Sequence, residues 1–300
     1  MADPLAIETT DLCKRYGHVE ALRGLTMQVP RGSIFGFLGR NGAGKTTTIK
    51  TLLGAVRPTS GTARVFALPA DAPDSSVEIR RRTGFVSEEK ELYDFMTVGE
   101  IIRFTAAFYP KWRRDLEQQY LTSFELTALD QKVKTLSRGT RTKLALLLAL
   151  SRGAELLILD EPTSGLDPAM AEEVLQALIA HVASEEMTVF FSSHQIAEVD
   201  QVADRVAIVD RGRLVIAGAL DDLRENYRRI QFVFESDAPD PVFHTPGVVR
   251  IQRKGRVLTV LTSAGTDTIL TEAQRLHPSS VNVVPVTLKE IFLETVAAEN

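Results

Sequence analysis

The sequence predicts an α/β fold with a mainly parallel sheet and flanking helices, followed by a small α+β domain. Two observations lead to this prediction. Over residues 33–210, apolar strand patterns alternate with helical patterns, an order typical of a parallel sheet covered by helices on both faces. Near residue 225 the composition changes, and a second set of short strands with a proline-rich loop begins. The predicted domains are therefore residues 1–225 and 226–300.

The elements of the first domain follow from hydrophobic periodicity and turn residues. Residues 5–38 predict short antiparallel strands, the last of them at 33–38, and residues 61–68 predict another strand. Residues 88–152 predict a helical subdomain. The expected helices are 97–109, 112–127, 137–151, 168–184 and 195–203, and the expected strands after the helical subdomain are 156–160, 188–193 and 205–210.

The second domain is expected to be a small α+β unit with a core of its own. Its expected strands are 229–235, 248–252, 256–262 and 281–286, and its expected helices are 267–276 and 287–298. The sequence leaves three roles open for this domain: extending a dimer contact, regulating the first domain, or contacting a partner.

The composition excludes several classes of protein. A net charge of −4 at pH 7 argues against a chain that mainly coats nucleic acid. The single cysteine, Cys13, excludes an internal disulfide framework, and the histidines show no metal-ligand spacing. The N-terminus lacks a signal-peptide pattern, and no window reaches about 18 consecutive apolar residues, so the chain is not expected to span a membrane by itself.

A glycine-rich loop, GRNGAGKT, occupies residues 39–46, directly after the strand expected at 33–38. It fits the pattern G-x-x-x-x-G-K-[ST]. In this pattern backbone amides surround the phosphates, the lysine contacts the outer phosphates, and the hydroxyl of the last residue binds magnesium. A helix follows from about Lys45, as this mechanism requires. Phosphate groups are therefore expected to contact Gly39, Arg40, Asn41, Gly42, Ala43, Gly44, Lys45, Thr46 and Thr47.

The apolar strand LLILD, residues 156–160, ends in Asp160, and a second acid, Glu161, follows it directly. Ligands of open α/β sheets bind at the carboxyl ends of the strands, and neighbouring strand residues face different ways. Asp160 is therefore expected to bind magnesium together with Thr46, while Glu161 faces the water that attacks the γ-phosphate. The alternative is a solvated acidic strand end.

With these two motifs, the chain resembles the ATP-binding subunit of an ABC (ATP-binding cassette) transporter over about residues 6–220. The resemblance implies a P-loop ATPase cassette that uses ATP and Mg²⁺, with Lys45, Glu161 and His194 as catalytic residues. Tyr16 occupies the place of the aromatic residue that stacks on adenine, and His194 that of the switch histidine at the γ-phosphate. The alternatives are a surface tyrosine and a structural histidine.

The segment LSRGT, residues 136–140, occupies the place of the family signature, usually LSGGQ. The resemblance implies that two cassettes pack head to tail, so that each signature contacts the ATP of the other. The residues expected to act in trans are Ser137, Arg138, Gly139 and, from the D-loop, Asp167. Basic residues are unfavourable at a helix start unless an anion binds there. The alternative, expected more for Lys143 than for Arg138, is that these side chains extend into solvent and pair with nearby acids.

The chain departs from the family where a glutamine usually follows the strand before the helical subdomain. Glu88 stands at that position, although Glu89 leaves the register open. Glu88 is therefore a candidate ATP contact and a further candidate magnesium ligand. Its charge is expected to slow hydrolysis or to change how a transport partner is sensed. Because Lys45, Asp160 and Glu161 are intact, an active ATPase is expected.

The resemblance further implies a subunit that powers an exporter, together with a second cassette, expected to form a homodimer, and separate integral membrane permease subunits. Residues 88–112, with Tyr93, Phe95 and Met96, are expected to line the groove that receives the membrane partner; the alternative is core packing. The C-terminal stretch 284–296, VPVTLKEIFLETV, resembles that of bacterial drug and antibiotic exporter subunits. The expected location is cytoplasmic, on the inner face of the membrane through the permease.

Two other functions are alternatives: a soluble ABC protein that acts on ribosomes or DNA, and a small-molecule phosphotransferase. Soluble ABC proteins that act on ribosomes usually hold two cassettes with a charged linker, and those that act on DNA insert long coiled coils before the signature. This sequence has neither feature, so no nucleic-acid partner is expected. Small-molecule phosphotransferases that share the phosphate loop lack the signature, D-loop and switch histidine together.

Overall fold

The structure is a computed structural model that describes residues 4–185, 187–240 and 243–297. It confirms the predicted α/β fold. The chain divides into two compact units, Met1–Ala217 and Gly218–Asn300. The division lies before α8 (Leu220–Asn226), a helix that the sequence analysis did not predict, whereas the predicted boundary lay near residue 225.

The first unit begins with an antiparallel sheet of order β2-β1-β4-β5. Its strands are β1 (Leu5–Tyr16), β2 (Val19–Pro30), β4 (Ser60–Val65) and β5 (Leu68–Pro69). The prediction of short strands was wrong for β1 and β2, which are 12 residues each. Register shifts interrupt their pairing, and Asp11 has a φ of 46°, so the turn signal at this position marks a bulge instead of a strand end.

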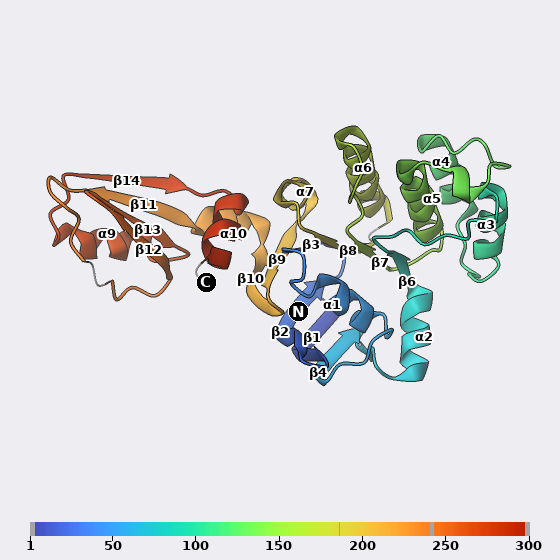
Figure 1. The fold of residues 1–300 in the computed structure, drawn as a ribbon, viewed down its shortest axis with the longest axis horizontal. Helices are drawn as coiled ribbons and strands as arrows, with labels where there is room; N and C mark the ends of the chain where they lie inside the picture. Colours follow the sequence, from blue (N-terminus) through green and yellow to red (C-terminus); the bar gives the residue numbers. More distant parts are fainter. Residues whose placement is uncertain (1–3, 186, 241–242, 298–300) are drawn as a thin grey trace. The chain divides into compact units, whose positions relative to one another are not determined.

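The central sheet of the first unit has the order β10-β9-β3-β8-β7-β6 (Figure 1). Its strands are β3 (Ile34–Gly39), β6 (Thr83–Val86), β7 (Leu156–Asp160), β8 (Thr188–Ser193), β9 (Arg205–Asp210) and β10 (Arg213–Ala219). The pairs from β6 to β9 are parallel. Every residue of β3, β7 and β8 is buried, which fits continuous apolar strands inside a parallel sheet.

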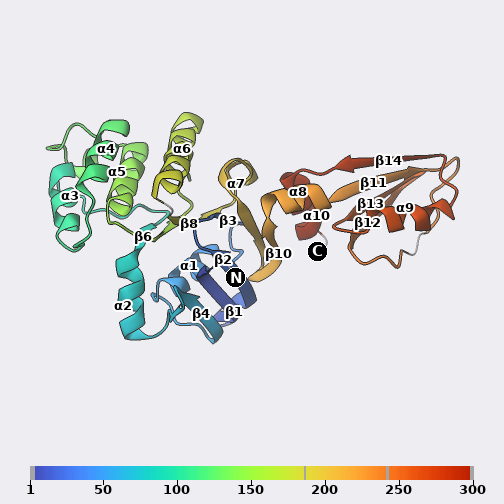
Figure 2. The ribbon, with the colours of Figure 1, turned by 180° about the vertical axis from the view of Figure 1, so that it is seen from behind.

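Helices cover this sheet and form the predicted helical subdomain, which contains α3, α4 and α5 (Figures 1 and 2). The helices of the first unit are α1 (Lys45–Leu52), α2 (Pro73–Arg82), α3 (Val98–Ala106), α4 (Arg114–Ser123), α5 (Arg138–Leu150), α6 (Pro168–Glu185) and α7 (Ile196–Val202), with a 3₁₀ turn at Val133–Thr135. A capping box of Thr97 and Glu100 starts α3. Helix α5 packs against α4 and β6 through an almost continuous buried apolar run.

Aromatic packing holds the strand that carries the phosphate loop. Phe35 and Phe37 of β3 contact Phe190 of β8, with ring centroids 5.8 Å and 5.2 Å apart. All three side chains are at most 1% exposed, and burying each contributes about 1.5–3 kcal/mol. The end of β3 is therefore a fixed support for the loop that follows.

The second unit is a four-stranded antiparallel sheet of order β12-β13-β11-β14. Its elements after α8 are β11 (Arg228–Val233), β12 (Val248–Lys254), β13 (Val257–Thr262), α9 (Thr266–Gln274), β14 (Ser280–Pro285) and α10 (Leu288–Ala297). Ile230 and Phe232 of β11 join Leu258 and Val260 of β13 and Ile269 of α9 in a separate core. All six elements expected here from the sequence are present.

Candidate ATP-binding active site

The glycine-rich loop connects β3 to the N-terminus of α1. Gly44 precedes the helix with a φ of 104°, and Gly42 has a φ of 82°, backbone conformations that favour glycine. A Cβ on Gly44 would lie 2.7 Å from the carbonyl oxygen of Ala21, so a side chain is also excluded by contact. The first turn of α1 contains no acid. Its free N–H groups and positive helix end therefore suit phosphate.

A cavity of about 440 Å³ opens at this loop. It is lined by Tyr16, Val19, Glu20, Ala21, Asn41, Gly42, Gly44, Lys45, Thr46, Thr47, Glu88 and Glu161. The cavity thus brings together residues from the β1–β2 hairpin, the phosphate loop, the segment after β6 and the end of β7. Three predicted contacts do not line the cavity. Ala43 is buried, and the carbonyl oxygens of Gly39 and Arg40 accept hydrogen bonds from Lys45, which does line it.

Lys45 and Glu161 form a buried ion pair at the base of the cavity. Lys45 Nζ donates to the carbonyl oxygens of Gly39 and Arg40, at 2.7 Å and 3.2 Å, and lies 3.1 Å from Glu161 Oε1. The other Glu161 oxygen is 2.7 Å from His194 Nδ1. Lysine, glutamate and histidine are therefore in one row, and His194, 42% exposed, lies at its solvent end.

A hydroxyl from the neighbouring strand organises the two acids. Ser192 Oγ of β8 donates to Asp160 Oδ1 at 2.6 Å and accepts from the backbone N–H of Glu161 at 3.0 Å. Asp160 and Glu161 are 3% and 5% exposed, so neither is a solvated strand end. Glu161 has a φ of 48°, a conformation that costs about 1–3 kcal/mol in a non-glycine residue. Ser192 was not predicted from the sequence.

Lys90 is a second unpredicted residue of the site. It is 4% exposed, and its Nζ donates to the backbone carbonyl of Glu161 at 3.1 Å. Desolvation by burial, followed by the nearby charge of Arg138, lowers the pKa of Lys90 to about 8. Lys90 also has a positive φ, 48°. A single hydrogen bond therefore joins two left-handed residues on neighbouring loops.

Glu88 lies in the cavity wall together with Glu161. Its Oε1 accepts from Ser164 Oγ at 3.5 Å, and the side chain is exposed. Of the two candidate glutamates, Glu88 therefore lines the cavity, and Glu89 is not among the lining residues.

The predicted trans-acting residues have partners within their own chain. Ser137 caps α5, accepting from the Thr140 N–H at 3.1 Å, and Arg138 reaches Ser164 Oγ at 3.5 Å. A Cβ on Gly139 would lie 1.8 Å from Met170 Sδ, so this glycine permits close packing of α6 on α5. Ser137 and Arg138 are exposed, whereas Gly139 is buried.

The remaining basic residues at the start of α5 pair with acids. Arg141 forms an ion pair with Asp94 at 2.7 Å, and Lys143 pairs with Glu173 of α6 at 2.8 Å. Lys143 is only 10% exposed. The expectation that Lys143 pairs with a nearby acid is therefore confirmed, but its side chain links two helices and does not extend into solvent.

Asp167 also has a local role. Its Oδ1 accepts from the Met170 N–H at 3.0 Å, which satisfies a free donor in the first turn of α6.

Tyr16, at the end of β1, is 46% exposed, and Lys14 Nζ lies 4.9 Å from the centre of its ring. Tyr16 is therefore partly exposed at the cavity that it lines, with a lysine over its ring.

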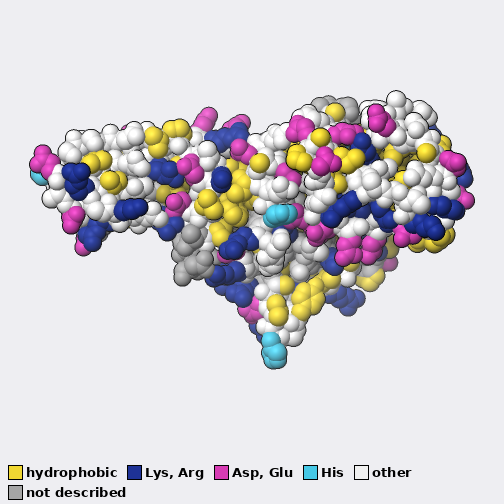
Figure 3. All heavy atoms as spheres, turned by 45° about the horizontal axis from the view of Figure 1, so that its top comes forward, with side chains coloured by type: hydrophobic (Ala, Val, Ile, Leu, Met, Phe, Trp, Pro, Cys, Tyr) yellow, Lys and Arg dark blue, Asp and Glu magenta, His cyan; other side chains and the backbone are white. Residues whose placement is uncertain are grey.

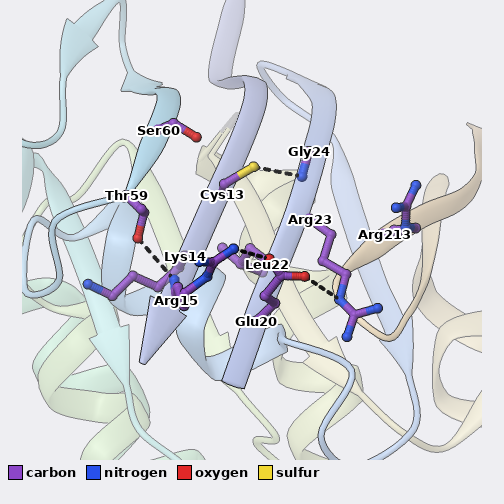
Figure 4. A pocket seen from close by; sticks show the side chains of 10 residues that line it. All are labelled: Cys13, Lys14, Arg15, Glu20, Leu22, Arg23, Gly24, Thr59, Ser60 and Arg213. Atoms are coloured by element: carbon purple, nitrogen blue, oxygen red, sulfur yellow. Dashed lines mark hydrogen bonds and ion pairs between the residues drawn. The ribbon is translucent and has the colours of Figure 1, made fainter. Parts of the chain in front are cut away.

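A neighbouring cavity of about 360 Å³ lies beside the same hairpin (Figure 4). Basic residues line it, but most are already engaged. Arg15 pairs with Glu20 at 2.5 Å, Arg23 lies 3.7 Å from the same carboxylate, and Lys14 donates to the Arg57 carbonyl. The hydrogen bond and charge of Arg15 lower the pKa of Glu20. These contacts brace the hairpin that presents Tyr16 to the nucleotide cavity.

The oxygen donors of the site fit magnesium. The hydroxyl of Thr46 is exposed at the cavity, and the carboxylate of Asp160 lies at the end of strand β7. Hydroxyl and carboxylate oxygens, completed by phosphate and water, are the ligands that Mg²⁺ prefers. Among the residues that the structure describes, no group of three or more His, Cys, Asp and Glu could hold a metal by itself.

Family models match both units of the chain. The family described as ABC transporter matches residues 22–164, and the C-terminal domain of ATP-binding proteins described as DrrA1-3-like matches residues 218–296. A further model, described as an AAA domain and putative AbiEii toxin of a type IV toxin–antitoxin system, matches residues 130–200, inside the first unit.

Curated relatives extend these matches. The bacitracin transport ATP-binding protein BcrA of Bacillus licheniformis is 34% identical over 262 residues, which covers 82% of this chain and 84% of that protein. The daunorubicin/doxorubicin resistance ATP-binding protein DrrA of Streptomyces peucetius is 36% identical over 225 residues, which covers 74% and 67%.

Solved structures give the same result. An ATP-binding subunit of an ABC transporter superposes with a TM-score of 0.66 and 29% identity, covering 73% of this chain and 92% of that one. A dimeric ATP-binding cassette in a post-hydrolysis state, bound to ADP and phosphate, has the same fold at a TM-score of 0.65 and 22% identity, covering 71% and 98%. The chain therefore belongs to the family of ABC transporter ATP-binding subunits, is an ABC-type ATP hydrolase, and has a DrrA-like C-terminal domain.

Proposed function

We propose that this chain pairs with a second copy around two ATP molecules and powers an exporter built with separate membrane subunits. The observation that carries the proposal is the single cavity that combines the phosphate loop, Tyr16 and Glu161. The export role is supported by the similarity to BcrA, a bacitracin transport protein, which extends over 82% of the chain.

The residues of the cavity divide the work of hydrolysis. The loop amides, the start of α1 and Lys45 bind the phosphates, while Tyr16 stacks on the adenine. Glu161 is the general base for the attacking water, and His194 orients its carboxylate from 2.7 Å. Mg²⁺ held by Thr46 and Asp160, with Glu88 as a further candidate ligand through water, would neutralise charge on the phosphates. When ATP binds, Lys45 contacts the phosphates instead of Glu161. The Glu161 carboxylate can then accept a proton from the attacking water.

The second copy completes each site through the signature. Ser137 and Arg138 are exposed at the start of α5, where the N–H groups and positive helix end favour an anion. We expect this anion to be the γ-phosphate held by the other cassette. Gly139 and Asp167 contribute by shaping the segment, since they set the packing and the start of α6. A reciprocal contact of this kind is two-fold symmetric.

A groove next to the active site fits the membrane subunit. About 340 Å³ in volume, it lies between β6 and the helical subdomain and is lined by Phe85, Val86, Ser87, Lys90, Glu91, Leu92, Thr105, Ala145, Leu148, Ala149 and Arg152. Tyr93 and Phe95, beside it in sequence, are 52% and 68% exposed and have ring centroids 5.7 Å apart. Exposed aromatic clusters are typical of interaction surfaces. Met96 is half-buried.

The surface supports a protein partner more than nucleic acid. Figure 3 shows acidic and basic side chains interspersed over the face in view, whereas nucleic-acid binding favours a basic stripe. No helix among the described residues is long and apolar enough to cross a membrane. The proposed place of the chain is the cytoplasmic face of the membrane, attached through the permease, and its similarity to a transport ATP-binding protein supports this proposal.

The proposal is tested with tagged Glu161→Gln protein, purified with ATP from gently solubilised cells of its source. Turnover should fall by about 10²–10⁴-fold because the base is lost, while ATP binding is kept and a closed dimer accumulates. An integral membrane protein in stoichiometric amount is expected to copurify. Lys45→Ala is the control, since it should lose ATP and the dimer. Ribosomes or DNA-bound proteins without a membrane protein would overturn the proposal.

A further inference from the structure

The sheet of the second unit has one edge that nothing in the described chain covers. β14 pairs with β11 on one side, from Ser280 opposite Val233 to Pro285 opposite Arg228. It is the last strand in the order β12-β13-β11-β14, and Figures 1 and 2 both show it along the border of this sheet. An edge strand has a row of unpaired N–H and C=O groups that can pair with another strand.

The two edges of this sheet differ in chemistry. β12, the other edge, carries Arg250, Arg253 and Lys254, and its pairing with β13 has a register shift near Val248. Charged side chains and irregularities are the usual protection of an edge against pairing. β14 reads SVNVVP and has no charged residue, and its six pairs with β11 run without a register shift. Only its terminal proline limits pairing.

Two apolar side chains of β14 are exposed although the residues opposite them on β11 are buried. Val283 and Val281 are opposite Ile230 and Phe232, both fully buried, and opposite residues lie on the same face of a sheet. Yet Val281 and Val283 remain 46% and 38% exposed. The hydrophobic face of the sheet therefore continues onto an edge that lacks a neighbour.

We propose that β14 pairs antiparallel with β14 of a second copy, which joins the two sheets of these units into one continuous sheet. A second copy fits because the strand is neutral: residues 276–288 contain no Asp, Glu, Lys or Arg. Two copies therefore meet without like-charge repulsion, and Val281 and Val283 of each strand extend the face of the other. The equivalent self-pairing of β12 would bring together Arg250, Arg253 and Lys254 of both copies, of which Arg250 and Arg253 have acidic partners in their own chain.

This contact is separate from the proposed ATP-dependent pairing of cassettes. No residue of the nucleotide cavity lies in the second unit. The β14 pairing therefore needs no nucleotide, and it holds two copies together whether or not their cassettes have closed. Measuring it without nucleotide distinguishes its failure from a failure of the proposed function.

The first test is the oligomeric state of the full chain without nucleotide, measured by analytical ultracentrifugation. The wild type should dimerise. Val283→Lys should weaken dimerisation by about tenfold, because it places a charge on the edge and a like charge across the two-fold axis. Gln252→Lys adds the same charge to β12 and should leave the dimer unchanged. A monomeric wild type, or equal weakening by both variants, overturns the proposal.

The second test is a cross-link that does not depend on a destabilising change. We place the two-fold axis of the pairing at Asn282, near the middle of β14, so that the two Asn282 residues are opposite each other. Cα atoms of opposite residues in antiparallel strands are about 4.5–5.5 Å apart, within disulfide range. In a Cys13→Ser background, Asn282→Cys should form an oxidised dimer without nucleotide, also when Lys45→Ala is added. Gln252→Cys should not. Absence of the Asn282→Cys dimer, or equal cross-linking at both positions, contradicts the pairing.

Discussion

At the scale of single residues, the active site depends on how Glu161 is held. Lys45 and His194 contact its two carboxylate oxygens, while Ser192 and Lys90 contact its backbone. The side chain is therefore oriented from the phosphate loop, and the left-handed backbone is fixed by β8 and by the loop after β6. The contacts come from three parts of the chain: the start of α1, the loop after β6 and the end of β8 with the residue after it.

Lys90 is expected to be a positioning residue for Glu161. Lys90→Met removes the hydrogen bond to the Glu161 carbonyl, a bond to a charged group that contributes about 1.5–3 kcal/mol, so kcat should fall by about tenfold or more. The Kd for ATP should stay the same, because Lys90 does not line the nucleotide cavity. Steady-state kinetics with a separate binding measurement test this. Lys90→Arg keeps a donor and should recover much of kcat; a purely structural role would show no such recovery.

Glu88 is expected to weaken nucleotide binding through its charge. Glu88→Gln removes a carboxylate from the wall of a cavity that binds phosphates, so the affinity for ATP should rise by about threefold to tenfold. The gain should shrink at high salt because the side chain is exposed. Titration of ATP at two ionic strengths, without Mg²⁺ so that Glu88 has no metal to contact, measures both effects. Glu89→Gln, which removes the same charge outside the cavity, should have little effect, and an equal gain in both variants would contradict the assignment.

The sequence could predict part of this site because short motifs carry it. The loop at 39–46 and the acids after β7 each follow their own strand, so spacing alone indicated Lys45 and Glu161. Ser192 and Lys90 could not be found in this way. A serine near the end of a buried strand and a lysine after a short strand are common, and only the pairing of β7 with β8 and the burial of Lys90 give them a role.

At the scale of elements, strong periodicity was predicted well and weak periodicity was not. Helices α3, α5 and α6 lie within a few residues of their predicted bounds. The prediction missed α2, whose sequence PDSSVEIRRR buries one apolar side chain, Ile79, and so shows no apolar face. It also missed β10, a half-exposed strand. In both, neighbouring elements supply most of the packing, and the local sequence contains little signal.

The start of α5 provides a prediction at this scale. Ser137→Ala removes the acceptor for the Thr140 N–H, so the free energy of unfolding should fall by about 1 kcal/mol. Ser137→Asn keeps a capping oxygen and should restore most of it. The change in the free energy of unfolding is measured by urea denaturation, from the unfolding transition of the first unit. If Ser137→Ala leaves the midpoint unchanged, the cap does not stabilise α5, and its serine acts only at the partner's nucleotide.

At the scale of the whole molecule, each unit has what it needs to fold alone. The first has the aromatic and aliphatic core beneath the phosphate loop. The second has the core around Phe232, and its last helix is tied to the sheet by Arg229 with Glu290 at 2.8 Å and by Arg250 with Glu294 at 2.5 Å. Two separate cores in one chain favour two cooperative units.

We therefore expect calorimetry of the full chain to give two unfolding transitions, of which nucleotide moves only one. ADP offers phosphates to the loop and is not consumed during the scan. At about a hundred times its Kd, it should stabilise the first unit by about 2.7 kcal/mol, which raises that midpoint by roughly 5–10 °C. The other transition should stay in place, because every predicted nucleotide contact precedes residue 218. Lys45→Ala should abolish the shift, and a single transition, or an equal shift of both, would mean that the two units unfold as one.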